Sequence, residues 1–460
     1  MQGGRRSSGS GGPLCAFIRR GEELLEKSHV SFTVESRAGS TLTGVTDASR
    51  APERRKVFHY SHHSTGLGHL VRSLSVARAM AEQSELMFCS GGPVPAAMPV
   101  PPGIHLVALP PIGTDEHGRL ASLDPSHSLE EAWEARRRLL LQTFEDFDPD
   151  ALVVELFPFG RRKFAGELIA LLETAREGRR RAVISSVRDV LVDAHPDKQS
   201  HDDEAARRLD AYFDAVIVHG DPEFARLEET FRPVTPPKVP VYYSGFVAPA
   251  TPVEAGLRHP GHLLVSAGGG RIGSRLLATA VESHRSVLAA EGVTTHVVTG
   301  PFLSDDLYMA LTDRARGVEG LKVERFVPNL ASAMAESTLS VSQCGYNTSI
   351  DLLRTGVHAI VVPYDQHRET EQWARACRLE SLGLAKVLPM ARLSGETLAD
   401  AVLEAMAGSS HGGLAGPGDG PESGNRTVPR RQPVRLDLDG AAKTADLVAS
   451  LMSEPAIPAP

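Results

Sequence analysis

The feature that most constrains the fold is an alternation of short apolar runs with segments of helical periodicity. Seven such runs lie between residues 57 and 245, and six more between residues 262 and 389. Buried strands that alternate with helices predict parallel sheets covered on both faces. Thirteen strands are too many for one sheet, and the Pro- and Gly-rich interval 233–261 divides them. The sequence therefore predicts an α/β protein with two doubly wound, Rossmann-like domains facing across a cleft. The predicted strands are 57–61, 85–90, 105–110, 151–156, 182–186, 215–220 and 239–245, then 262–267, 295–300, 321–326, 338–342, 359–364 and 385–389.

Composition sets the domain boundaries. Residues 1–55 and 408–433 are rich in Gly, Ser, Pro and polar residues, and we expect disorder because they can bury too little apolar surface to offset ordering entropy. The first domain is expected over 56–245 and the second over 246–407. Residues 434–453 carry spaced apolar side chains and predict a final helix that packs back onto the body.

Charge, hydropathy and cysteine content exclude several classes of protein. The chain has 49 Lys and Arg against 57 Asp and Glu, so it lacks the basic excess of a general nucleic-acid binder. No stretch approaches the ~18 consecutive apolar residues of a membrane-spanning helix. The four cysteines lie far apart, which indicates neither a disulfide framework nor a zinc knuckle. We expect a cytoplasmic protein without a nucleic-acid partner or a membrane span; peripheral membrane contact is compatible with these features.

The loop after the first predicted strand contains Gly66, Gly68 and His69. Glycines let backbone amides approach a ligand, and a helix start adds partial positive charge. That charge disfavours imidazolium, so His69 is expected to be neutral and basic near pH 7, as a general base requires. A tight strand–helix turn in which the histidine only caps or packs locally is the alternative.

In the second half, a glycine-rich loop follows a predicted strand and opens a helix. It contains Gly268, Gly269, Gly270 and Gly273 and matches G-x-G-x-x-G. The next predicted strand, 295–300, ends without the acidic residue that would hold an adenosine ribose, which argues against NAD. Two interpretations of this loop remain. Its backbone amides bind an anion, or its glycines only allow a tight turn.

Segment 343–353 is the most informative one. Asn347 or Thr348 is expected to cap a helix whose free amides receive a diphosphate, and Asp351, one turn later, to reach ribose hydroxyls. After the next strand, Glu371 and Gln372 offer hydrogen-bonding groups for sugar hydroxyls. Alternatively, carboxylates in a first turn only complement the helix dipole.

The fourth predicted strand of the first domain ends at Glu155, a second candidate for the base. Three consecutive cations follow, at Arg161, Arg162 and Lys163. At a helix start on the ligand edge of a sheet, they favour an acceptor with a phosphate or carboxylate. Phe157 and Phe159 are candidates to hold a ring or an apolar tail, and Arg188 after the fifth strand is a weaker anion ligand. The alternative is an exposed basic helix start with core phenylalanines.

No metal site is predicted. The Asp-x-Asp patterns within 146–150 lie at the amino end of a strand, and that of 437–439 lies beyond the predicted linker. His59, His62 and His63 have no carboxylate spaced to complete a site, and we expect them to be surface or supporting histidines.

Together, the Gly-x-Gly-His helix start, the glycine-rich loop, and Cys344–Asp351 followed by Val362-Pro363 and Glu371-Gln372 resemble GT-B glycosyltransferases. The similarity covers about residues 56–407. It is strongest to the branch that contains the bacterial N-acetylglucosaminyltransferase of lipid II synthesis and bacterial predicted glycosyltransferases.

This resemblance implies an inverting enzyme that uses a nucleotide sugar, with UDP expected, without a metal or other cofactor, and with a small-molecule or lipid-linked acceptor. His69 matches the proposed base, and Gly66 and Gly68 match its phosphate-side turn. The donor-binding positions are matched by Gly345, Asn347 and Thr348 for the diphosphate, Asp351 for the ribose, Glu371 and Gln372 for the sugar, and the backbone of Phe326 and Val327 for uracil.

Two alternatives stay open. The run Gly68-His69-x-x-Arg72 also resembles UDP-sugar hydrolases of nonulosonic acid pathways, in which a histidine activates water; Arg72 therefore joins the candidate phosphate or acceptor residues. A non-catalytic nucleotide-sugar sensor would keep Asn347 and Asp351 but would be indifferent to loss of His69.

Overall fold

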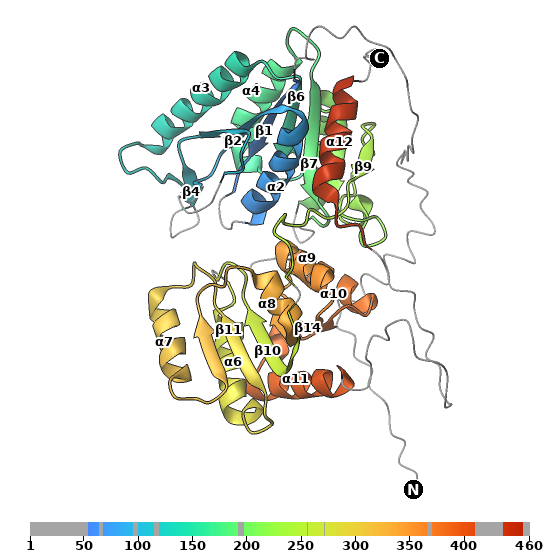
Figure 1. Cartoon of the computed structure of the whole chain (residues 1–460). Coiled ribbons are helices and arrows are strands. Elements are labelled where there is room, and N and C mark those ends of the chain that lie inside the picture. The colour runs from blue at the N-terminus through green and yellow to red at the C-terminus, as the bar shows by residue number, and fades with distance from the viewer. Residues whose placement is uncertain are drawn as a thin grey trace, which may run out of the picture.

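The structure is a computed structural model, and it describes most of the chain between residues 54 and 453. The described residues are 54–63, 68–94, 100–114, 119–191, 197–254, 256–270, 272–365, 370–409 and 436–453. Gly66 and nearly all of the two segments expected to be disordered lie outside these ranges. Two α/β domains lie one above the other, with the second below the first (Figure 1).

The first domain is built on a parallel seven-stranded sheet of order β3-β2-β1-β6-β7-β8-β9. Its central strands are apolar runs buried on both faces, as in β6, where every residue is buried. The strands are β1 (Lys56–Ser61), β2 (Glu85–Ser90), β3 (Ile104–Ala108), β6 (Ala151–Glu155), β7 (Ala182–Arg188), β8 (Ala215–His219) and β9 (Val241–Tyr243). The main helices are α2 (Gly68–Gln83), α3 (Leu129–Phe147), α4 (Ala165–Arg176) and α5 (Lys198–Tyr212).

The second domain is a parallel six-stranded sheet of order β12-β11-β10-β13-β14-β15. Its strands are β10 (His259–Ser266), β11 (Thr294–Val298), β12 (Leu321–Glu324), β13 (Ser337–Ser342), β14 (His358–Val361) and β15 (Lys386–Val387). Its helices are α6 (Ser274–Ser283), α7 (Asp305–Ala315), α8 (Leu330–Glu336), α9 (Tyr346–Thr355), α10 (Glu371–Ser381) and α11 (Gly395–Ser409).

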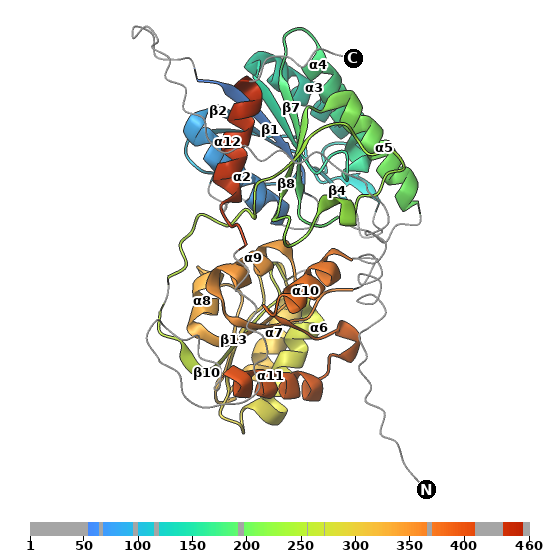
Figure 2. The same cartoon turned by 90° about the vertical axis from the view of Figure 1, so that its right-hand side faces the viewer.

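All thirteen predicted strands are present, with small differences at their ends. A short antiparallel hairpin, β4 (Ile112–Thr114) with β5 (Leu120–Ser122), was not predicted. The strand order reverses between β1 and β6 in the first sheet and between β10 and β13 in the second. At such switch points the loops after neighbouring strands diverge and leave a crevice at the carboxyl edge. In both views these edges of the two domains face each other (Figures 1 and 2).

The final helix, α12 (Gly440–Ser453), lies against the first domain, although the chain reaches it from the second (Figure 2). Its Val448 and Leu451 share an apolar cluster with Leu74 and Val76 of α2. An antiparallel bridge between Val247 and Asp439 joins the chain entering α12 to the chain leaving the first domain. The helix thereby ties the chain's last described segment to the first sheet. Among the described residues, no helix is long and apolar enough to cross a membrane.

Candidate functional site

The centre of the first-domain site is a pair of side chains, the partly buried His69 and the buried Glu155. His69 is the second residue of α2, and Glu155 ends β6, so the pair occupies the switch point of the first sheet. The His69 Nδ1 and Glu155 Oε1 atoms are 2.6 Å apart. A carboxylate only accepts hydrogen bonds, so Nδ1 carries the proton and Nε2 is left as an acceptor. Arg72, one turn along α2, donates from Nη2 to the same Oε1 at 2.5 Å.

Burial sets the ionisation of this pair. Burial lowers the pKa of His69 to about 3, although the nearby Glu155 carboxylate acts to raise that pKa. Burial also raises the pKa of Glu155, but His69, Arg161 and Arg72 outweigh it and hold that pKa well below its usual value. The imidazole is therefore neutral at pH 7 beside an ionised carboxylate. A general base that is oriented by a carboxylate requires this state.

The second-domain counterpart is the start of α9. Its N-cap is Gly345, and no side chain caps it, so the expectation that Asn347 or Thr348 is the cap is wrong. The first backbone bond of the helix runs from Ser349 N–H to Gly345 O at 3.0 Å. The N–H groups before Ser349 therefore have no acceptor within the helix. These groups and the helix dipole are suited to an anion.

These two places lie close together where the two domains meet. A β-carbon on Gly68 would lie 3.7 Å from Nδ2 of Asn347, so the start of α2 touches the start of α9. The Arg72 guanidinium lies 5.3 Å from the ring centroid of Tyr346, the first residue of α9. His69, which follows Gly68 in the chain, therefore lies near the start of α9 on the opposite domain.

The glycine-rich loop after β10 forms a second wall of the crevice. Gly268 and Gly270 have positive φ angles of 57° and 86°, which favour glycine. A β-carbon on Gly268 would lie 4.0 Å from Oγ1 of Thr348, so this loop lies beside the α9 start. A β-carbon on Gly270 would come within 2.5 Å of the Thr299 carbonyl oxygen. The loop is therefore packed tightly against the next loop of the sheet.

The remaining donor candidates follow β12 and β13 in the chain. Phe326, after β12, is 66% exposed, and Val327 is partly buried. Asp351 on α9 lies 3.4 Å from Arg354, measured from Oδ1 to Nη1. Burial raises the pKa of Asp351 to about 6, although the neighbouring Arg354 acts to lower that pKa. This carboxyl group therefore titrates close to neutral pH.

Glu371 and Gln372 have protein partners in this structure. The Gln372 Oε1 accepts from Cys344 N–H at 3.2 Å and Tyr364 N–H at 3.1 Å, so it joins the loops after β13 and β14. Glu371 forms an ion pair with Arg188 of the first domain. Arg188, a candidate anion ligand in the sequence, is thus engaged across the domain interface.

A second ion pair lies beside this one. Asp189 accepts from Nε and Nη2 of Arg375 at 2.9 and 2.8 Å, and both side chains are almost fully buried. Burial opposes the charge on Arg375, but Asp189 outweighs it and raises the pKa of Arg375. Tyr346 also bridges the domains, because its hydroxyl donates to His219 O and accepts from Val247 N–H. Sequence reasoning missed Asp189, Arg375 and Tyr346, because pairs so distant along the chain leave no local pattern.

Several side chains differ from expectation. His59, His62 and His63, expected as surface or supporting histidines, are buried, so the surface alternative is wrong and the supporting one stays a prediction. His59 lies within β1, and His62 and His63 directly follow it. Both faces of this strand are covered, so neighbouring residues exclude water from the three side chains. Phe157 is core, while Phe159 lines a cavity. Glu155 is the hydrogen-bonding partner of His69 and not a second base. Arg72 is a buried partner of Glu155, not a free phosphate ligand.

The cations after Glu155 line a cavity of the first domain. Arg161 Nη2 is 3.5 Å from Glu155 Oε2, and Arg162 opens a short 3-10 helix. Among the described residues, no group of three or more His, Cys, Asp or Glu side chains is arranged to hold a metal ion.

Comparisons with known proteins agree with this arrangement. Residues 264–412 match the glycosyltransferase family 28 C-terminal domain. The curated UDP-N-acetylglucosamine--N-acetylmuramyl-(pentapeptide) pyrophosphoryl-undecaprenol N-acetylglucosamine transferase of Vibrio cholerae serotype O1 (strain M66-2) is 28% identical over 155 residues, 34% of this chain and 43% of the relative. The protein of the same name from Salmonella arizonae is 34% identical over 79 residues, 17% of this chain and 22% of the relative. The chain therefore matches less than half the length of these relatives.

Solved structures share the fold at low sequence identity. CalG4, the calicheamicin glycosyltransferase, has a TM-score of 0.53 and 17% identity and covers 78% of this chain and 91% of its own. MurG of Acinetobacter baumannii has a TM-score of 0.50 and 14% identity, covering 86% and 99%. A UDP-glucosyltransferase from Polygonum tinctorium has a TM-score of 0.54 and 14% identity, covering 88% and 100%. The fold is GT-B, which confirms the predicted fold class.

Proposed function

We propose that this chain, which has a GT-B fold and matches the glycosyltransferase family 28 C-terminal domain over residues 264–412, is an inverting glycosyltransferase that takes a sugar from a UDP donor without a metal ion. The observation that carries the proposal is the meeting of the His69–Glu155 pair with the free amides of α9. A base and an anion site on opposite walls of one crevice suit displacement at a carbon between them.

On the donor side, the diphosphate binds the N–H groups at the start of α9 and the glycine-rich loop after β10. Asp351 accepts from ribose hydroxyls, and the uracil lies toward Phe326 and Val327. As the bond between the anomeric carbon and the diphosphate breaks, negative charge develops on the leaving oxygen. Fixed amide dipoles stabilise that charge without reorganisation during the reaction.

On the acceptor side, His69 Nε2 takes the proton of an acceptor hydroxyl. The oxygen attacks the anomeric carbon from the face opposite the diphosphate, so the C–O bond forms as the old one breaks and the centre inverts. The imidazolium that results lies 2.6 Å from the Glu155 carboxylate, which stabilises it. The interdomain ion pairs of Arg188 and Asp189 hold the two walls together and help to exclude water.

The test is incubation with UDP-sugars, beginning with UDP-N-acetylglucosamine, in the presence and absence of cell extract. UDP release that depends on extract supports a transferase. Release without extract indicates a hydrolase, and binding without release indicates a sensor. The His69→Ala variant is the matched control, because the proposal requires it to bind UDP and lose turnover.

A further inference from the structure

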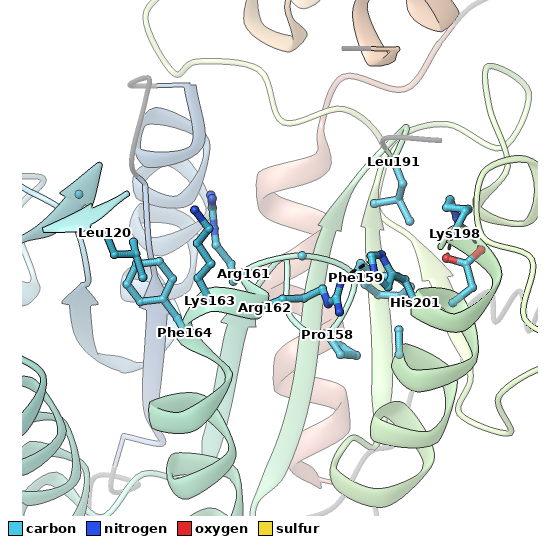
Figure 3. Close-up of a pocket in the computed structure, with 14 residues that line it drawn as sticks. Leu120, Pro158, Phe159, Arg161, Arg162, Lys163, Phe164, Leu191, Lys198 and His201 are labelled. Carbon is cyan, nitrogen blue, oxygen red and sulfur yellow. Dashed lines mark hydrogen bonds and ion pairs between the residues drawn. The ribbon is translucent and has the colours of Figure 1, made fainter. Parts of the chain in front are cut away.

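The first domain contains a cavity of ≈ 480 Å³ lined in part by Arg161, which also contacts Glu155. It lies between the loop after β6 and the start of α5, and Figure 3 shows the side chains that line it. The volume is that of a site for a small organic molecule. No residue of the second domain is among its lining residues.

Basic side chains dominate the lining of this cavity. Arg161, Arg162, Lys163 and Lys198 face one carboxylate, that of Asp202. Lys198 is already neutralised, because its Nζ donates to Asp202 at 2.5 Å and to the Thr230 carbonyl at 2.6 Å. The positive charge left over belongs to the three consecutive cations.

These three cations have little compensation from the protein. Within the described residues, Lys163 forms no ion pair or hydrogen bond, and the nearest carboxylate to Arg162 is that of Glu204, at 4.0 Å. The Nε and Nη2 atoms of Arg161 are buried and make no hydrogen bond. The Glu155 carboxylate, 3.5 Å from Arg161 Nη2, is shared with His69 and Arg72, so it offsets the Arg161 charge only in part, and an anion in the cavity adds to that compensation.

The local backbone is also unfavourable for a purely structural role. Arg161 has a φ of 58°, in the left-handed region that disfavours residues with a β-carbon. Arg162 and Lys163 lie at the start of a helical segment, where the helix dipole repels cations. Both features work against stability, and an anion in the cavity offsets the second of them, the repulsion between the cations and the helix start.

The rest of the cavity wall is apolar. It consists of Leu120, Pro158, Phe159, Phe164 and Leu191. The Phe159 ring is held by an edge-to-face contact with Phe231, with centroids 4.9 Å apart. A rigid aromatic wall beside a cationic cluster suits a ring or short apolar body that carries a charged group.

Arg161 connects this cavity to the proposed base. Its Nη2 lies 3.5 Å from Glu155 Oε2, and the other oxygen of Glu155 binds His69. In Figure 3 the Arg161 and Lys163 side chains extend in the same direction, whereas Arg162 extends toward His201. An anion on Arg161 is therefore linked to His69 through the side chains of Arg161 and Glu155.

We propose that this cavity binds the acceptor, and that the acceptor carries a carboxylate or phosphate next to a ring or compact apolar group. The role of the bound molecule as acceptor rests on the proposed glycosyltransferase function. The anion site itself does not depend on that function. Arg161, Arg162 and Lys163 bind the anion. The apolar wall that contains Phe159 and Phe164 contacts the apolar part of the molecule.

Binding of defined probes tests the site without turnover. Phenyl phosphate and benzoate represent the two anion sources, and phenol is the neutral control, each titrated by ligand-observed NMR against the full chain. We expect at least one anion to bind about tenfold more tightly than phenol. The Arg162→Gln/Lys163→Gln variant should lose that preference, while Arg316→Gln, an exposed cation on the second domain, should keep it.

The proposal is overturned if both anions bind no better than phenol, or if the double variant binds them as the wild type does. Binding of phosphatidylglycerol vesicles without binding of either small anion also overturns it, because a membrane surface would then explain the cations. UDP titration of the same samples separates this result from the proposed function: UDP affinity should be unchanged in the double variant.

Discussion

At the residue scale, catalysis depends on how His69 is held. Its Nδ1–H bond to Glu155 leaves Nε2 free to accept a proton, and Glu155 in turn is held by Arg72. A neutral imidazole with a fixed tautomer is a competent base, whereas the same ring without its carboxylate has no partner to stabilise the imidazolium.

Replacing His69 with Ala should lower kcat by about 10²–10⁴-fold, the usual contribution of a general base. Glu155→Gln should lower kcat with little change in UDP affinity, because neither side chain belongs to the diphosphate site. Single-turnover assays with a UDP-sugar and acceptor extract, together with UDP titration, measure the two effects. Full turnover by His69→Ala would remove the histidine from the mechanism.

Donor binding should depend on the ionisation of Asp351. Because burial raises its pKa to about 6, the carboxylate that accepts from ribose hydroxyls is protonated as pH falls through that value. We expect uridine affinity to decline between pH 7 and pH 5; uridine lacks a phosphate whose own titration would interfere. Asp351→Asn should bind weakly at every pH in calorimetric titrations. Equal pH dependence in the two proteins would argue against this role.

At the scale of elements, two ion pairs join the end of β7 to helix α10. In one pair the cation belongs to the first domain, and in the other it belongs to the second. Arg188 and Asp189 are adjacent in the chain, and their partners Glu371 and Arg375 are one turn apart on α10. Helical spacing therefore turns two adjacent charges into a complementary pair of contacts.

The Asp189→Ala variant leaves Arg375 buried without a carboxylate, which should cost about 3–5 kcal/mol of unfolding free energy. The double variant Asp189→Leu/Arg375→Met should recover part of this loss, since no buried charge remains. Urea unfolding can be followed by the only two tryptophans, Trp133 in the first domain and Trp373 in the second. A loss below about 1 kcal/mol in the single variant would contradict the assignment of a buried pair.

The same scale shows what the sequence could predict. Buried strands reveal themselves by continuous apolar runs, and the loops after them by Gly, His and Asn residues, so the thirteen strands and most candidate residues were accessible. The Arg188–Glu371 contact joins residues 183 positions apart, and no periodicity encodes it. The burial of His59 was hidden for another reason: alternation in a strand covered on both faces no longer distinguishes inside from outside.

At the scale of the whole molecule, buried neutral histidines tie stability to pH. Burial lowers the pKa of His59 to about 4 and that of His62 to about 2, and it also lowers the pKa values of His63, His69 and His219. The unfolded chain, with histidine pKa values near 6.5, binds more protons below that pH than the folded chain does.

Stability should therefore fall on acidification from pH 6.5 to pH 5, above the range in which most carboxylates are protonated. Each such histidine contributes a slope of up to about 1.4 kcal/mol per pH unit, and Asp351, whose pKa is raised, acts in the opposite direction. Urea unfolding across this range measures the slope. His59→Leu should reduce it, and replacement of the exposed His127 by Gln should not. A flat profile would contradict the buried, neutral state.

The most direct test of the account is a crystal structure of the full chain with UDP. We predict that the diphosphate accepts hydrogen bonds, at about 2.7–3.2 Å, from the N–H groups at the start of α9, with the His69 ring facing it from the first domain. UDP bound away from residues 345–348, or His69 directed away from the crevice that holds it, would contradict the central claim.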